Sequence, residues 1–134
     1  MYKIEKKSWG YHLTFGDFMD AKEMKAWVDE SQAMVKPSGP GFGVFVDMRT
    51  LKPLAQDAQL VMQDGQKHYK ASGMKRSVVI LASKLLTMQF KRIAQETGIY
   101  EWERYLDASS VPDWEAKGIR WIRDGVDPDV GAPA

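Results

Sequence analysis

The chain has 134 residues, 44% of them hydrophobic and 28% charged, which is typical of one folded domain and not of a disordered segment. Nineteen Lys and Arg nearly balance eighteen Asp and Glu, so the net charge of +1 excludes a strong overall attraction to nucleic acid or to an anionic membrane. The lack of cysteine excludes disulfides, thiolate metal sites and a cysteine nucleophile, and two distant histidines argue against a structural zinc site.

The first third of the sequence predicts a β-hairpin followed by a helix. Apolar and polar residues alternate in YKIEKK (2–7) and again in YHLTF (11–15), with turn residues at 8–10 between them. Residues 20–36 then place their apolar side chains at helical spacing, and Asp20 is positioned as the N-cap.

Two later runs predict the central strands of a sheet. GFGVFV (41–46) and SVVILA (77–82) are apolar without alternation, which is typical of parallel strands covered on both faces. The four residues that we expect to be almost fully buried in neighbouring strands are Val44, Val46, Val79 and Leu81.

Helical spacing returns between and after these runs. The predicted helices span 53–70, 83–98 and 109–124, and a half-exposed strand spans 101–107. Pro53 falls in the first turn of the first helix, Ser83 is positioned as the N-cap of the second, and Ser110 with Asp113 resembles a capping box for the third.

The element order is therefore ββαβαβαβα, which predicts an α/β fold with a mixed sheet of about five strands and helices packed against it. We expect a single domain over 1–122 and a frayed tail over 123–134, which is rich in Pro, Gly and Asp. No apolar run approaches the length of about 20 residues that spans a bilayer, so we expect no transmembrane segment and a cytoplasmic location.

The element order, the FVDMRTLKP strand and loop (45–53) and the SVVILA strand resemble the STAS domain, named for sulfate transporters and anti-sigma-factor antagonists. They resemble more loosely its Sec14-like lipid-binding relatives. The resemblance covers residues 1–122 and implies a STAS-like regulatory module. In the regulatory members, a strand ending in Asp is followed by a loop and an Asp-Ser-Ser helix start, where a partner kinase phosphorylates one serine.

The positions that correspond to this Asp-Ser-Ser start by their spacing from Asp47 are Ala55, Gln56 and Asp57. None of the three can be phosphorylated by a serine kinase, so the resemblance implies a module without the usual switch. Asp57 has two interpretations: a negative charge that suits the first turn of a helix, or a fixed mimic of the missing phosphate.

Polar residues follow each predicted central strand, and ligands of α/β sheets prefer the carboxyl ends of parallel strands. The candidate ligand- or partner-binding residues are Asp47, Arg49, Thr50, Asp57, Ser83 and Lys84. We interpret DMRT (47–50) as the lip of a binding surface that begins where the strand ends. The structural alternative is that these side chains only satisfy turn amides and cap helices.

No catalytic residue, metal site or cofactor is predicted, since the sequence shows no nucleophile with a base, no Walker loop and no dinucleotide fingerprint. KHYKASGMKR (67–76) is the one basic cluster, suited to an acidic partner or a phosphate, or simply to the end of a helix. Leu60, Leu85 and Met88 fall outside the apolar stripes of their helices and would mark an interface if they clustered.

The leading functional hypothesis is a non-enzymatic binding or regulatory module that acts through protein contacts, with a protein partner or a second copy of itself and no nucleic acid. The alternative is a protein that binds a small apolar molecule or lipid in a pocket lined by its eight methionines and five tryptophans. An enzyme is the third and weakest hypothesis.

Overall fold

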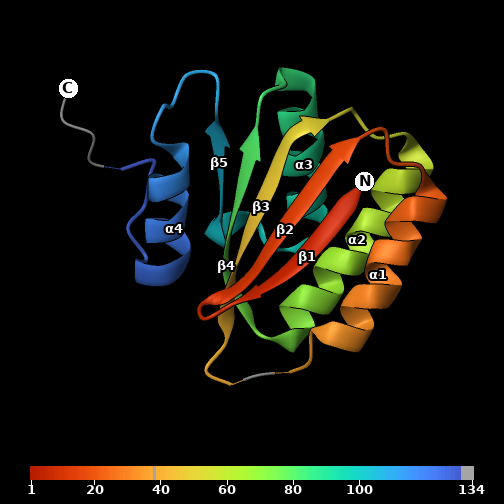
Figure 1. The fold of residues 1–134 in the computed structure, drawn as a ribbon, viewed down its shortest axis with the longest axis horizontal. Helices are drawn as coiled ribbons and strands as arrows, with labels where there is room; N and C mark the ends of the chain where they lie inside the picture. Colours follow the sequence, from red (N-terminus) through yellow and green to blue (C-terminus); the bar gives the residue numbers. More distant parts are fainter. Residues whose placement is uncertain (38, 131–134) are drawn as a thin grey trace.

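The computed structural model describes residues 1–37 and 39–130 and is built around one five-stranded sheet (Figure 1). The strands are β1 (Tyr2–Lys7), β2 (Gly10–Asp17), β3 (Phe42–Leu51), β4 (Met74–Leu81) and β5 (Glu103–Asp107). The helices are α1 (Ala21–Met34), α2 (Gln56–Ser72), α3 (Lys84–Thr97) and α4 (Trp114–Asp124), with a short 3-10 helix η1 (Tyr100–Trp102). This order confirms the predicted ββαβαβαβα arrangement.

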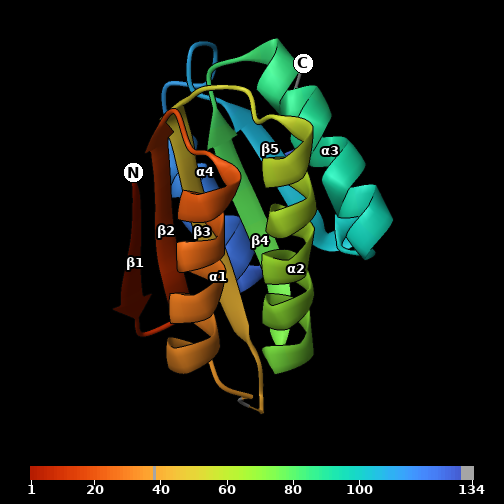
Figure 2. The same ribbon diagram turned by 90° about the vertical axis from the view of Figure 1, so that its right-hand side faces the viewer.

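The strands lie in the sheet in the same order as in the chain, β1-β2-β3-β4-β5. β1 is antiparallel to β2, and all later neighbours are parallel. Because parallel crossovers are right-handed, adding strands steadily in one direction puts α1, α2 and α3 on the same face. Figure 2 shows these three helices side by side, and α4 returns to cover the other face.

The larger core lies between the sheet and α1–α3. Val44, Val46, Val79 and Leu81 are 1%, 6%, 1% and 1% exposed, which confirms their predicted burial in the two central strands. At the middle of this core the ring of Trp27 stacks on that of Tyr69, with 5.6 Å between the centroids.

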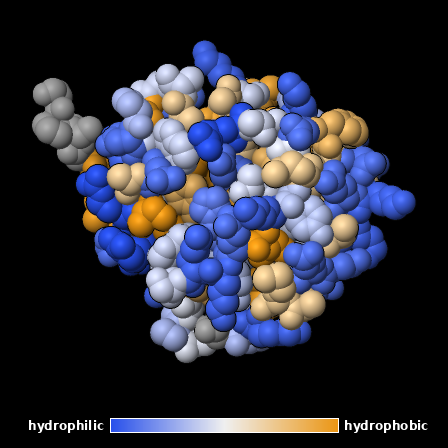
Figure 3. Space-filling model, viewed as in Figure 1, coloured by the Kyte–Doolittle hydropathy of each residue, from blue (hydrophilic) through white to orange (hydrophobic). Residues whose placement is uncertain are grey.

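The smaller core lies between the sheet and α4. Alternate residues of the central strands, such as Phe45 and Ile80, pack there against Trp121 and Ile122. The covering is partial, because α4 packs on β3, β4 and β5. The view of Figure 3 is mostly hydrophilic, with its hydrophobic side chains in small separate spots.

Several predicted boundaries are wrong. α2 begins at Gln56, so Pro53 precedes the helix instead of entering its first turn. The strand predicted from residue 101 begins at Glu103, because Tyr100–Trp102 forms η1. Ser110 lies in a turn before α4, whose N-cap is Asp113 without a side-chain capping bond, so the predicted capping box does not form.

The C-terminal segment is tied to the sheet as far as it is described. The domain boundary placed after residue 122 falls inside α4, which continues to Asp124. Beyond it, Arg104 of β5 donates two hydrogen bonds of 2.9 Å to the carboxylate of Asp127. The rest of the predicted tail, 131–134, lies outside the described residues. Among the helices of the described chain, none is both long enough and apolar enough to cross a bilayer.

Candidate functional site

The DMRT segment belongs to β3 and is not a loop after it, which corrects the sequence interpretation. β3 continues to Leu51 because β2 still offers a partner there: Gly16 pairs with Thr50 and Asp17 with Leu51. Pairing with β4 stops at Asp47, opposite Ile80. The segment is therefore a strand extension at the carboxyl end of the sheet, supported on one side only.

Asp47 and Arg49 form a closed pair on the α4 face of this extension. Arg49 donates from Nε to one carboxylate oxygen at 3.0 Å and from Nη2 to the other at 2.9 Å. Its guanidinium also lies over the ring of Trp114, 4.3 Å from the centroid. Burial would raise the pKa of Asp47, but the hydrogen bonds from Arg49 outweigh it and the pKa is lowered. Asp47 is a bound anion and not a free base.

Ser83 and Lys84 lie at the next helix start. Ser83 caps α3 by accepting a hydrogen bond of 3.2 Å from the Leu86 amide. Lys84 is exposed and contributes, behind the hydrogen bonds from Ser109, to lowering the pKa of Asp107 at the end of β5. Ser83 is therefore engaged by the helix cap, and Lys84 adds an exposed positive charge beside Asp107.

Thr50 follows Arg49 in β3 and Asp57 lies in the first turn of α2, and within the described chain neither side chain bonds to the two groups above. Asp57 is exposed in the first turn of α2, where its carboxylate accepts a hydrogen bond of 2.8 Å from the next amide, that of Ala58. Thr50 is exposed and lies against Gly16, at which an added Cβ would come within 2.6 Å of the threonine oxygen. The six candidate residues thus form two local groups and two separate positions, not one pocket.

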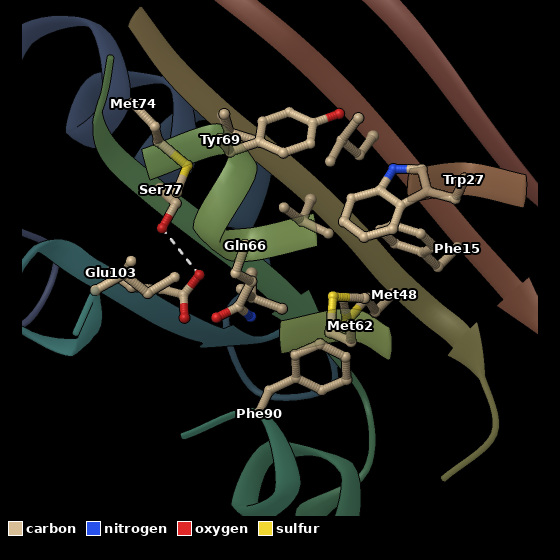
Figure 4. A pocket seen from close by; sticks show the side chains of 15 residues that line it. Phe15, Trp27, Met48, Met62, Gln66, Tyr69, Met74, Ser77, Phe90 and Glu103 are labelled. Carbon is tan, nitrogen blue, oxygen red and sulfur yellow. Dashed lines mark hydrogen bonds between the residues drawn. The ribbon is translucent and has the colours of Figure 1, made fainter. Parts of the chain in front are cut away.

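The structure also contains an interior cavity of about 30 Å³ between the sheet and α2 (Figure 4). Its walls are mainly apolar and include the methionines 48, 62 and 74. Near Ser77, Glu103 and Gln66 the lining becomes polar. A cavity of this size has room for about one or two water molecules and none for an acyl chain.

Glu103 is the unusual residue of this lining, since it is only 4% exposed. The hydroxyls of Ser77 and Tyr105 donate to its two oxygens at 2.9 Å and 2.6 Å. Among the described residues no cationic side chain pairs with Glu103, and burial raises its pKa to about 7 while the two hydroxyls act in the opposite direction. The carboxyl group therefore changes its charge near neutral pH.

Two further polar groups belong to this interior. Gln66 is buried and accepts a hydrogen bond of 2.7 Å from the Thr97 hydroxyl. The indole N–H of Trp27 is buried and finds no acceptor among residues 1–37 and 39–130. The cavity lining thus has the Glu103 carboxyl group at one end and the Trp27 ring at the other, separated by thioether and aromatic side chains.

Sequence reasoning missed Glu103 because the strand 101–107 was interpreted as half exposed. The available signal was alternation, which puts Glu103 on the same face as Tyr105, the side that α3 covers. Within the described chain no three His, Asp or Glu side chains gather in a way that would hold a metal ion. No protein-family model matches this sequence, and no curated protein matches it.

Proposed function

We propose that this protein is a non-enzymatic binding module that acts through contacts with a protein partner. The observation that carries the proposal is a group of large apolar side chains exposed around the carboxyl end of the sheet. They are Phe18, Leu60, Leu85 and Met88, with exposed fractions of 64%, 57%, 55% and 68%, and we call them the apolar rim. Phe18 follows β2, and the other three lie in the first two turns of α2 and α3, so all four belong to one end of the sheet. Large exposed apolar side chains that share one end of a molecule are candidates for an interaction surface.

The polar groups of the same end support a contact surface more than a reaction site. Asp47 is engaged by Arg49, Ser83 by a helix amide and Asp57 by its neighbouring amide. General acid-base chemistry needs a titratable group that is free to exchange its proton with a substrate. Fixed polar groups beside exposed apolar ones instead resemble a protein interface, in which polar residues surround an apolar centre.

Membership of the STAS group is part of this proposal. The five-stranded mixed sheet and its element order support it, and Asp57 stands in the exposed helix start where regulatory members carry a serine. We propose that a constant charge at Asp57 replaces phosphorylation and that the module works in the cytoplasm.

The proposal is tested by native mass spectrometry of tagged protein purified from its own host. We expect a stoichiometric protein partner with the wild type and its loss with Leu85→Ser combined with Met88→Ser. A control with two exposed valines changed, Val126→Ser with Val130→Ser, should keep the partner. A partner retained equally by all three proteins, or no partner at all, would refute the role of the apolar rim.

A second function has one specific observation in its favour, the interior cavity with Glu103. Its ligand would be a small apolar molecule with a hydrogen-bond donor for the carboxyl group, admitted by movement of the flexible methionines 48, 62 and 74. The same mass spectra distinguish it, because a retained small molecule that disappears in Glu103→Gln would favour this function over protein contact.

A further inference from the structure

Two depressions lie next to each other at the amino end of the parallel strands, beside the turn between β1 and β2. Their volumes are about 470 Å³ and about 360 Å³. Both are lined by Ser8, Trp9, Gly41 and Phe42. Because these residues belong to both linings, the two depressions are neighbours: the first lies beside the end of α1, the second beside the end of α4, and Trp9 belongs to the wall of each.

Six cationic side chains line these two neighbouring depressions, which we together call the basic groove. Lys6, Lys7 and Lys36 line the first depression, and Lys75, Arg76 and Arg123 line the second. No Asp or Glu of the described chain lines either one. Among described residues, the only ion pair made by the six joins Arg123 to the exposed Asp124 at 3.3 Å. Positive charge is therefore concentrated here, although the whole chain carries only +1.

Helix ends do not account for this concentration. The carboxyl ends of α1, α2, α3 and α4 all point towards this end of the molecule, and each carries the equivalent of about half a negative charge. Four such ends and Asp124 offset about half of the six cations. Moreover, Lys6 and Lys7 stand on the hairpin and Lys75 on a strand, not on a last helical turn. An uncompensated positive charge remains.

Arg76 is held in place in the second depression. Its Nη2 donates to the Arg123 carbonyl at 3.5 Å, and its guanidinium carbon is 5.7 Å from the centre of the Trp121 ring. Gly125 has φ of 73°, and a Cβ there would come within 2.9 Å of Arg76 Nη1. The Nε–H of Arg76 is buried and has no acceptor among the described residues. Arg76 is therefore fixed beside the second depression, and one of its buried N–H groups has no protein acceptor in the described chain.

We propose that the basic groove binds a ligand that carries two phosphate groups, one over each depression. Each depression supplies three cations, which matches the multiple charge and the several acceptor oxygens of a phosphate. The guanidinium of Arg76 offers planar donors suited to phosphate oxygens, and the lysines act as point charges around it. The ligand is either a soluble bisphosphate or a lipid headgroup with the same chemistry. The site is separate from the apolar rim.

The soluble form is tested by calorimetric titration with inorganic phosphate, pyrophosphate and tripolyphosphate at low salt. We expect the probes with more than one phosphate to bind more tightly than inorganic phosphate. Lys7→Glu combined with Lys75→Glu, one change in each depression, should weaken binding at least about tenfold. The control Lys22→Glu with Lys52→Glu makes the same change of net charge at the opposite end and should bind like the wild type. Circular dichroism checks that all three proteins are folded.

The lipid form is tested by sedimentation with phosphatidylcholine vesicles that contain, or lack, a phosphatidylinositol bisphosphate. Binding of the soluble probes that the groove variant weakens assigns a soluble ligand. Binding only to the phosphorylated vesicles, weakened by the same variant, assigns a headgroup. No binding in either assay, or an equal loss in the groove and control variants, overturns the proposal. Since the groove variant changes residues at the opposite end of the parallel strands from the apolar rim, failure here leaves the proposed protein contact to its own test.

Discussion

Two carboxyl groups on opposite faces of the sheet have pKa values that are shifted in opposite directions. Asp47, on the α4 face, accepts two hydrogen bonds from Arg49, and its pKa is lowered. Within the described chain the carboxyl group of Glu103, on the α1–α3 face, accepts bonds from the hydroxyls of Ser77 and Tyr105 alone, and burial raises its pKa to about 7. Because hydroxyls supply hydrogen bonds without charge, they do not offset the loss of water as a guanidinium does. The nature of the partner decides which carboxyl stays ionised.

The largest effect should come from removing the buried carboxyl. Glu103→Ala leaves two hydroxyls without their acceptor and enlarges the cavity, so we expect the free energy of unfolding at pH 5 to fall by about 4 kcal/mol. Urea unfolding followed by tryptophan fluorescence measures it. The exposed Glu101 is the control, and Glu101→Ala should change the free energy by less than about 0.5 kcal/mol. Similar small losses in both variants would contradict the buried position of Glu103.

The pH dependence of stability should sharpen the comparison. Between the ordinary pKa of 4.5 and the folded value of about 7, the folded state binds the Glu103 proton more tightly than the unfolded chain does. Stability should therefore fall as the pH rises through this range, by about 3 kcal/mol, and stay level above it. Glu103→Gln has no group to titrate there, so its unfolding free energies between pH 4 and pH 8, about the range concerned, should lack this fall. Parallel profiles of the two proteins would refute the raised pKa.

The smallest effect should come from the paired carboxyl. Because the pKa of Asp47 is lowered, the stability that it contributes is present above its ordinary value of 3.8 and is lost as the pH falls through the folded value. We expect Asp47→Asn to cost about 1 kcal/mol at neutral pH, with the difference from wild type disappearing in strong acid. Asp64→Asn, at an exposed position of α2, is the control. A difference that persists unchanged in acid would show that packing, and not charge, is lost.

The fold was predictable because its signals are local. The unalternating runs around Val44 and Val79 have no polar side to expose, so they had to be covered on both faces. The length of β3 was not predictable, since residues 48–51 are held by β2, a partner more than thirty positions earlier in the chain. Strand ends depend on the neighbouring strand more than on the residues themselves.

The buried position of Glu103 and the basic groove were the hardest features to predict. A glutamate in a strand is usually exposed, and only its shared face with Tyr105 indicated that Glu103 is buried. Of the basic groove, the sequence showed the cations near Lys75 alone. Lys7, Lys36 and Arg123 join them from separate segments, and their proximity depends on the topology of the sheet.

The sequential strand order has a consequence for how the chain folds. Each strand pairs with the one made just before it, so no strand waits for a partner that has not yet been synthesised. The hairpin of β1 and β2 closes locally, and each later helix and strand can be added to an existing edge as it leaves the ribosome. Intermediates on this path carry a single growing edge, at the last strand formed. The final edge strand, β5, is also the shortest of the five, which limits the unpaired backbone that the finished sheet offers to other chains.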